Sequence, residues 1–137
     1  QHYAVRVGGG VSGRASLDEG LVITANHARA VGGVGIAVAR ARAAAGGAPI
    51  HAEAATLADV EDALGAGAGV ILFTGASPEE LDQAARLCAG RARVVAAGPV
   101  PADRVAVFAG AGADTLATGS VTESAPAADI AFEVRPA

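Results

Sequence analysis

Short apolar runs, each stopped by polar or turn-forming residues, recur five times along the chain. Runs of this length are typical of buried strands. They cover residues 21–27, 48–53, 69–73, 93–97 and 114–118. A segment with helical character separates each run from the next. Strands that alternate with helices predict an α/β fold with a parallel sheet, because parallel neighbours need a long crossover connection.

Polar residues and glycines follow the apolar part of each predicted strand. Ligands of parallel α/β folds sit at the carboxyl ends of the strands. The pattern therefore predicts a site made of Asn26, His27, Glu53, Thr74, Gly98, Gly119 and Ser120. Instead of forming a site, the pair Asn26-His27 could cap a strand end and hydrogen-bond to the backbone. Glu53 favours function, since a carboxylate among alanines costs desolvation energy unless it is paired.

The segments between the strands carry helix signals. The sharpest is Ser77-Pro78-Glu79-Glu80, in which Ser77 caps the helix, Pro78 takes its first position and Glu80 completes a capping box. Thr56 begins another helix in the same way. Residues 32–45 and 101–110 complete the set, and Val105 and Phe108 are the expected core anchors of the last one.

The two ends of the chain are less regular. Residues 5–7 fit a short strand or the end of a helix, and the glycines at 8–10 form a bend or a phosphate cradle. Arg14 follows them as a candidate anion contact. At the other end, apolar residues alternate over 129–134, which predicts an edge strand with Ile130, Phe132 and Val134 on one face.

Composition narrows the class of protein. The 137 residues fit one domain, and the net charge of −4 without a basic cluster argues against a nucleic-acid partner. No apolar run reaches the roughly 18 residues of a membrane span. The single cysteine, Cys88, has no mate for an internal disulfide, which favours a buried thiol in a reducing, cytoplasmic compartment.

Several motifs resemble those of quinolinate phosphoribosyltransferase, also called nicotinate-nucleotide pyrophosphorylase. Residues 4–11, Ala-Val-Arg-Val-Gly-Gly-Gly-Val, are similar to the family's Ala-Val-Arg-x-Gly-Gly-Gly run. Residues 21–27 resemble its Leu-Ile-Lys-Asp-Asn-His strand end, and 50–57 stand where it has Glu-Val-Glu-Val. Residues 119–130 are similar to its closing Gly-Ala-Leu-Thr-His-Ser stretch and final strand. The resemblance is to the C-terminal half of the family and runs over nearly the whole chain.

This resemblance implies a six-stranded α/β barrel, usually dimeric, that acts on quinolinate and phosphoribosyl pyrophosphate with Mg²⁺. The products would be nicotinate mononucleotide, carbon dioxide and pyrophosphate. It implies Glu53 and His27 as catalytic residues, with Glu53 also as a metal ligand. It further implies substrate contacts from Arg14, Asn26, Thr24 and Thr74, and 5′-phosphate contacts from Gly98, Gly119 and Ser120.

The chain departs from the family at several charged positions. Thr24 stands at the family's lysine and Ala25 at its aspartate, while Thr74-Gly75 replaces Asp-Asn and Glu123 stands at a late histidine. Arg14, His27 and Glu53 are kept. The substitutions imply either a diverged, weakened enzyme with a less anionic substrate, or an inactive scaffold or partner subunit that binds a phosphorylated small molecule.

Five strands, where the family barrel has six, predict an incomplete barrel. Open strand edges invite pairing with another segment, and the chain begins with Gln1 and contains no methionine. We therefore expect a single barrel-type domain, 1–137, that lacks an upstream strand and an N-terminal domain. A homo-oligomer or a complementing chain would supply the missing strand. The alternative is a self-contained form in which residues 129–134 cover the gap.

Overall fold

The computed structural model describes residues 2–12 and 19–135. Five parallel strands stand in chain order across one sheet, β1-β2-β3-β4-β5. Their bounds are β1 Leu21–Ile23, β2 Ile50–Ala54, β3 Val70–Thr74, β4 Arg93–Ala97 and β5 Thr115–Ala117. The predicted parallel sheet is confirmed, and the strand bounds differ from the sequence ranges mainly at the ends.

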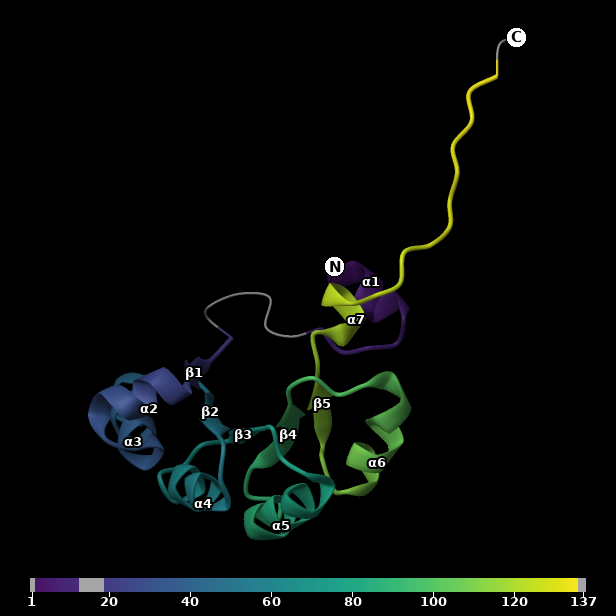
Figure 1. Ribbon diagram of the computed structural model, residues 1–137. Coiled ribbons are helices and arrows are strands. Elements are labelled where there is room, and N and C mark those ends of the chain that lie inside the picture. Colours follow the sequence, from purple (N-terminus) through teal and green to yellow (C-terminus); the bar gives the residue numbers. More distant parts are fainter. Residues whose placement is uncertain (1, 13–18, 136–137) are drawn as a thin grey trace.

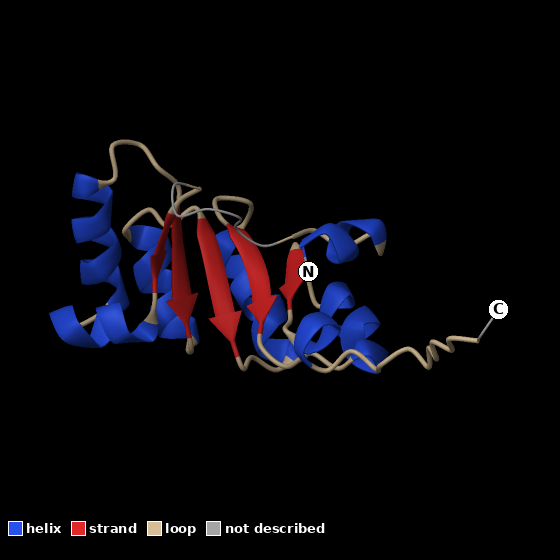
Figure 2. Ribbon diagram, turned by 90° about the horizontal axis from the view of Figure 1, so that it is seen from above, coloured by secondary structure: helices blue, strands red, loops and turns tan. Residues whose placement is uncertain are grey.

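The helices of the described chain are α1 His2–Val7, α2 Ala25–Val31, α3 Val34–Ala44, α4 Leu57–Gly65, α5 Pro78–Cys88, the 3-10 turn η1 Ala102–Arg104, α6 Val105–Gly110 and α7 Ser120–Glu123. Helices α3 to α6 lie along one face of the sheet (Figures 1 and 2). The short helices α1 and α7 lie together beyond the end of β5, away from the others (Figure 1). The arrangement is an arc of strands with helices on its convex side, which is part of an α/β barrel.

The core lies between the strands and the helices α3, α4 and α5. Alternation along β2 shows this directly: Ile50, Ala52 and Ala54 are buried against helices, whereas His51 and Glu53 are half-buried on the opposite, concave face. Alanines and β-branched residues dominate the core, and its largest fully buried side chains include Phe73, Ile71 and Leu81. Because most core residues are small, the helices and strands can approach closely, but few large side chains pack between them.

The first strand is shorter than the sequence pattern predicted. It ends at Ile23, and Asn26 and His27 lie in the first turn of α2. Thr24 is extended and caps this helix, while the backbone N–H of Thr24 donates to Nδ1 of His27 at 3.1 Å. A polar residue followed three positions later by a hydrogen-bonding side chain is a capping arrangement. The prediction of a strand through His27 was therefore wrong.

The predicted edge strand over 129–134 is also absent. The segment extends away from the body of the molecule (Figure 1), and Ile130, Phe132 and Val134 are 84%, 89% and 81% exposed. Alternation makes a strand only where a neighbouring backbone supplies hydrogen bonds.

The prediction for α6 was half right. Val105 is 41% exposed at the start of the helix and is not a core residue, whereas Phe108 packs against the core as predicted.

The cap of α5 gives a direct test of the helix signals. Oγ of Ser77 accepts from the backbone N–H of Glu80 at 3.2 Å, and the Glu80 carboxylate accepts from the N–H of Ser77 at 2.8 Å. We expect Ser77→Ala to lower the free energy of unfolding by about 1 kcal/mol, since one helix N–H loses its partner. Urea denaturation measures the change. Ser124→Ala, at an exposed position after α7, is the matched control and should leave the midpoint unchanged.

Cys88 is buried at the end of α5, as predicted. Burial raises the pKa of the thiol above its ordinary value of 9.0, and Asp114 adds to the rise while Arg91 opposes it. The unfolded thiol therefore ionises first, so the stability of the fold should fall as pH rises above 9. Denaturation midpoints between pH 8 and 10 should show a downward slope that Cys88→Ala reduces. An identical slope in the variant would contradict this account.

Candidate functional site

Glu53, near the carboxyl end of β2, reaches across to the helix that follows β1. Its Oε2 accepts from the backbone N–H of Ala25 at 2.9 Å, so the carboxylate holds the first residue of α2. The side chain is half-buried. This hydrogen bond offsets part of the desolvation cost that singled Glu53 out in the sequence. The Glu53 carboxylate therefore has a hydrogen-bond partner, and it lies at the edge of the sheet formed by the carboxyl ends of the strands.

His27 acts on the same helix turn. Its Nδ1 accepts from the Thr24 N–H, and Oγ1 of Thr24 lies 3.0 Å from the same nitrogen. His27 and Glu53 therefore hold two successive backbone N–H groups, those of Thr24 and Ala25. The structure brings Thr24, His27 and Glu53 together around one turn, while Asn26 is exposed on the same helix. The capping interpretation left open for Asn26-His27 holds for His27.

A cavity of about 200 Å³ opens beside Glu53 at the ends of β2 and β3. Thr74, the last residue of β3, lines it and donates from Oγ1 to the carbonyl of Ala54 at 3.1 Å. The other lining residues are Ala25, Ala28, Arg29, Val34, Ala54, Ala55 and Asp59. The two catalytic and substrate candidates Glu53 and Thr74 thus share one cavity, as the strand-end argument predicted.

Sequence reasoning missed two charged residues of this cavity, Arg29 and Asp59. Oδ2 of Asp59 accepts from the backbone N–H groups of Ala55 and Thr56 at 3.1 and 3.0 Å, which completes the predicted cap of α4. Arg29 belongs to α2, which the sequence pattern had assigned partly to a strand. Once α2 begins at Ala25, helical spacing places Ala25, Ala28 and Arg29 on one face. That spacing was the available signal.

The three phosphate candidates follow β4 and β5: Gly98 lies in the loop after β4, and Gly119 and Ser120 lie at the start of α7. Gly98 has a positive φ of 136°, and its N–H donates to the carbonyl of Ala117 at 3.1 Å. The N–H of Ser120 donates to Oγ1 of Thr118 at 3.2 Å, and Oγ of Ser120 donates to the carbonyl of Val100 at 3.4 Å. The structure therefore brings the two loops together, but internal bonds use both of these N–H groups.

Gly119 lies directly against a carboxylate. A Cβ built at this position would stand 2.8 Å from Oε2 of Glu123. An anion bound at Gly119 would meet this negative charge unless the Glu123 side chain moved away. A further hollow of about 250 Å³ lies nearby, lined by Gly75, Gly98 and Phe108 among others. Of the candidate contacts, Arg14 lies outside the described residues.

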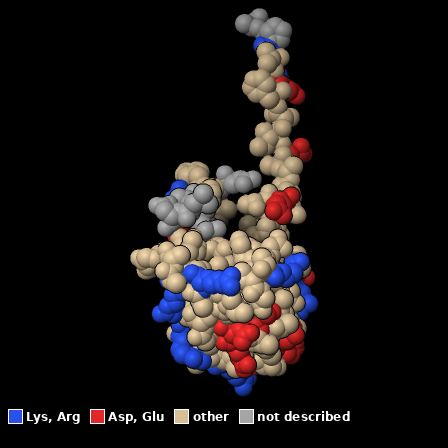
Figure 3. Space-filling view, turned by 90° about the vertical axis from the view of Figure 1, so that its left-hand side faces the viewer, with Lys and Arg blue, Asp and Glu red and all other residues tan. Residues whose placement is uncertain are grey.

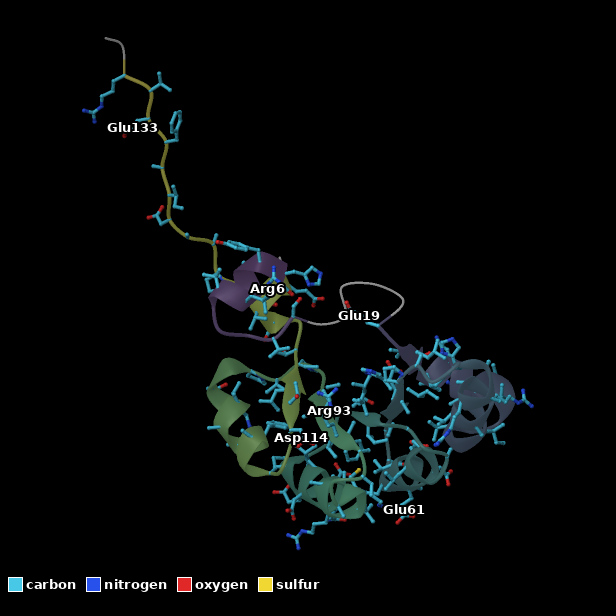
Figure 4. The ribbon with its side chains drawn as sticks, turned by 180° about the vertical axis from the view of Figure 1, so that it is seen from behind. Arg6, Glu19, Glu61, Arg93, Asp114 and Glu133 are labelled. Atoms are coloured by element: carbon cyan, nitrogen blue, oxygen red, sulfur yellow. The ribbon has the colours of Figure 1, made fainter. Side chains whose placement is uncertain are left out.

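The charge distribution shows no continuous basic surface on the face of the molecule that carries α2 and α3 (Figure 3). Basic side chains are scattered around its rim, and acidic side chains gather in one patch. All ten basic residues of the chain are arginines. Arg93 and Asp114 lie on β4 and just before β5, and Glu61 lies on α4 (Figure 4), so these charges belong to other parts of the fold than the Glu53 cavity.

The described residues contain neither a preformed metal site nor a membrane-spanning helix. No group of three His, Cys, Asp or Glu side chains within residues 2–12 and 19–135 is arranged to hold a metal ion. A metal at Glu53 would therefore need further ligands from elsewhere, such as water or a bound substrate. None of the helices in the described part of the chain is both long and apolar enough to cross a bilayer.

Known proteins resemble this chain over almost its full length. Residues 1–133 match the family described as "Quinolinate phosphoribosyl transferase, C-terminal domain". The probable nicotinate-nucleotide pyrophosphorylase [carboxylating] of Bacillus subtilis is 33% identical over 98% of this chain and 47% of its own length. The human nicotinate-nucleotide pyrophosphorylase [carboxylating] is 32% identical over 98% of this chain and 46% of its own.

Solved structures agree. NadC from Streptococcus pyogenes has a TM-score of 0.82 and 38% identity over 89% of this chain and 43% of that chain. The nicotinate-nucleotide pyrophosphorylase from Ehrlichia chaffeensis has a TM-score of 0.84 and 30% identity over 89% and 44%. The chain spans about half the length of the relatives it matches. By sequence and by fold, this chain belongs to the quinolinate phosphoribosyltransferase C-terminal domain family.

Proposed function

We propose that this chain takes part in phosphoribosyl transfer from phosphoribosyl pyrophosphate to a pyridine carboxylate, in a diverged and weakened form. The observation that carries the proposal is the half-buried carboxylate of Glu53 at a strand-end cavity, in a chain whose fold follows that of NadC over 89% of its length. In such a transfer, the ring nitrogen forms a bond to the ribose C1 as the bond from C1 to pyrophosphate breaks.

The proposed residues within the described chain would have the following roles. Glu53 would stabilise positive charge that develops at the ribose C1, and His27 would keep the first turn of α2 in position for it. Thr24, Asn26 and Thr74 surround the same turn and cavity, and Arg14 would add an anion contact from outside the described residues. Gly119 would contact the 5′-phosphate after displacement of Glu123. Gly98 and Ser120 would contact it once their N–H groups release their present partners, the Ala117 carbonyl and Oγ1 of Thr118.

Mg²⁺ would arrive with the pyrophosphate group. This ion takes one or two carboxylates together with substrate phosphates more often than a full protein cage. Glu53 would provide such a carboxylate, and it would have to share its charge between the metal and the N–H of Ala25. The metal would neutralise charge on the leaving group.

Ligand binding tests the proposal before turnover is measured. We expect phosphoribosyl pyrophosphate with Mg²⁺ to raise the melting temperature of the chain, because a ligand that binds only the folded state stabilises it. Glu53→Gln should reduce the shift, whereas Glu61→Gln, at an exposed position on α4, should preserve it. Equal shifts for both variants, or no shift for the unmodified chain, would contradict a role for Glu53.

One observation favours a second function, that of an inactive scaffold or partner subunit. Glu53 accepts from the N–H of Ala25 in α2, and His27 accepts from the N–H of Thr24, its cap residue. The N–H groups of Gly98 and Ser120 also have partners. A site whose polar groups satisfy one another can persist without a substrate. A phosphorylated small molecule that raises the melting temperature without any turnover would support this alternative.

We also propose a protein partner, either a second copy or a complementing chain. The outer strands β1 and β5 each have one strand neighbour in the described sheet, and no helix of the α2–α6 series covers its concave face. Exposed edges favour pairing with another segment.

We further propose a cytoplasmic site of action, which fits the lone buried thiol of Cys88. The protein partner has its own test. Size-exclusion chromatography tests the partner, and a cooperatively melting monomer would count against it.

A further inference from the structure

Arg29 is the cationic side chain among the residues that line the Glu53 cavity. It follows Ala25 and Ala28 at the spacing of one helix face, so α2 presents all three to the same space. The ion pairs between described residues join Arg86 to Asp82 and Arg135 to Glu133. Arg29 is therefore an exposed cation at the edge of the cavity, and no described carboxylate lies within ion-pair distance of it.

The acidic residues of the same cavity already have other partners. Glu53 accepts from the N–H of Ala25, and Asp59 accepts from two N–H groups at the start of α4. These bonds fix both carboxylates on backbone and leave the guanidinium of Arg29 with its fork of donors for a ligand. Such a fork matches a carboxylate with two parallel hydrogen bonds.

The remaining wall is small and apolar. Ala28 and the buried Val34 contribute to it, and the volume is about 200 Å³. Cavities for drug-sized ligands begin near 300 Å³, so this one suits a single ring. A ligand with one carboxylate could place it on Arg29, but a second carboxylate would share this space with Glu53 and Asp59. Carboxylates that share one site repel each other.

We propose that Arg29 is a specificity-determining residue that binds the carboxylate of a one-ring monocarboxylate and disfavours a dicarboxylate. This inference rests on the proposed function, since it names the acceptor class of that same cavity. Thr74, with its hydroxyl held by the Ala54 carbonyl, would limit the other end of the ring.

Calorimetric titration of the chain with three probes tests the inference: nicotinate, picolinate and quinolinate. We expect at least one monocarboxylate to bind more tightly than quinolinate. Arg29→Gln should weaken that binding roughly 10- to 100-fold, the effect of losing a charge-assisted hydrogen bond. Arg29→Lys should retain part of it, because the charge remains while the fork is lost. Inorganic phosphate serves as the competing anion.

Arg40→Gln, which removes an exposed arginine from α3, is the matched control and should bind as the unmodified chain does. Melting temperatures of all variants separate a binding defect from loss of the charge at the end of α2. The inference is overturned by equal binding to Arg29→Gln, by tighter binding of quinolinate, by displacement with phosphate alone, or by no binding at all.

The proposed function fails in a different way. The chain could bind a monocarboxylate in a way that depends on Arg29 and yet transfer nothing from phosphoribosyl pyrophosphate. That result would refute catalysis and support the proposed binding role of Arg29. Phosphoribosyl transfer to quinolinate at an equal rate in Arg29→Gln would support catalysis and refute the proposed binding role of Arg29.

Discussion

Phe73→Ala is expected to lower the free energy of unfolding by about 3–5 kcal/mol. Phe73 is 1% exposed in the middle of the sheet, where it packs within the core between strands and helices. Most core neighbours are alanines and valines, which are too small to fill the space that the ring would leave. Domains of this size are typically stable by about 5–15 kcal/mol, so the variant should be close to unfolding at ambient temperature.

Phe132→Ala makes the same chemical change at a position that is 89% exposed. Its free energy of unfolding, measured by urea denaturation beside that of Phe73→Ala, should change by less than about 0.5 kcal/mol. The pair tests the fold and the absent edge strand together. A large loss of stability in Phe132→Ala would show that residues 129–134 pack against something in solution. A small loss in Phe73→Ala would show that the core lies elsewhere.

The parallel sheet could be predicted from the sequence because its strands obey one simple rule. Most residues of β3 and β4 are buried, and both strands appear as continuous apolar runs with turn residues after them. The caps at Thr56 and Ser77 were equally local, since a capping box depends on residues three positions apart. Long-range packing was not needed to find any of these features.

The errors share one physical origin, which is that a local pattern does not say what lies next to it. Thr24 ends an apolar run, and its local contact with His27 fits a helix start as well as a polar strand end. The contact that distinguishes the two joins Ala25 to Glu53, 28 positions away. The alternation at Ile130 and Phe132 needed a neighbouring backbone that the described chain does not provide. Arg29 was missed because its significance depends on the start of α2.

The lost lysine leads to the second large effect, on turnover. With quinolinate and labelled phosphoribosyl pyrophosphate, we expect little or no nicotinate mononucleotide from this chain. The resemblance places Thr24 at the family's lysine and Ala25 at its aspartate. Each lost charge-assisted contact is worth on the order of 2 kcal/mol, or about 30-fold in rate. Two such losses would together reduce the rate on the order of 10³-fold.

Thr24→Lys should restore part of this rate, roughly 30-fold, if the lysine position contacts the anionic substrate. The substitution has a structural cost, because Thr24 is the cap residue of α2 and its hydroxyl lies 3.0 Å from Nδ1 of His27. Loss of a cap lowers stability by about 1 kcal/mol. Thr24→Met therefore serves as the control: it removes the same cap and adds similar length without charge.

The two variants give a clear comparison when product formation is measured at a temperature where both are folded. Equal rates for Thr24→Lys and Thr24→Met would show that the charge at this position does not act on the substrate. Rapid turnover by the unmodified chain would show that the lost lysine and aspartate are dispensable here. A gain confined to Thr24→Lys would place the ring carboxylates of quinolinate at the first turn of α2, within reach of the turn that Glu53 and His27 hold in place.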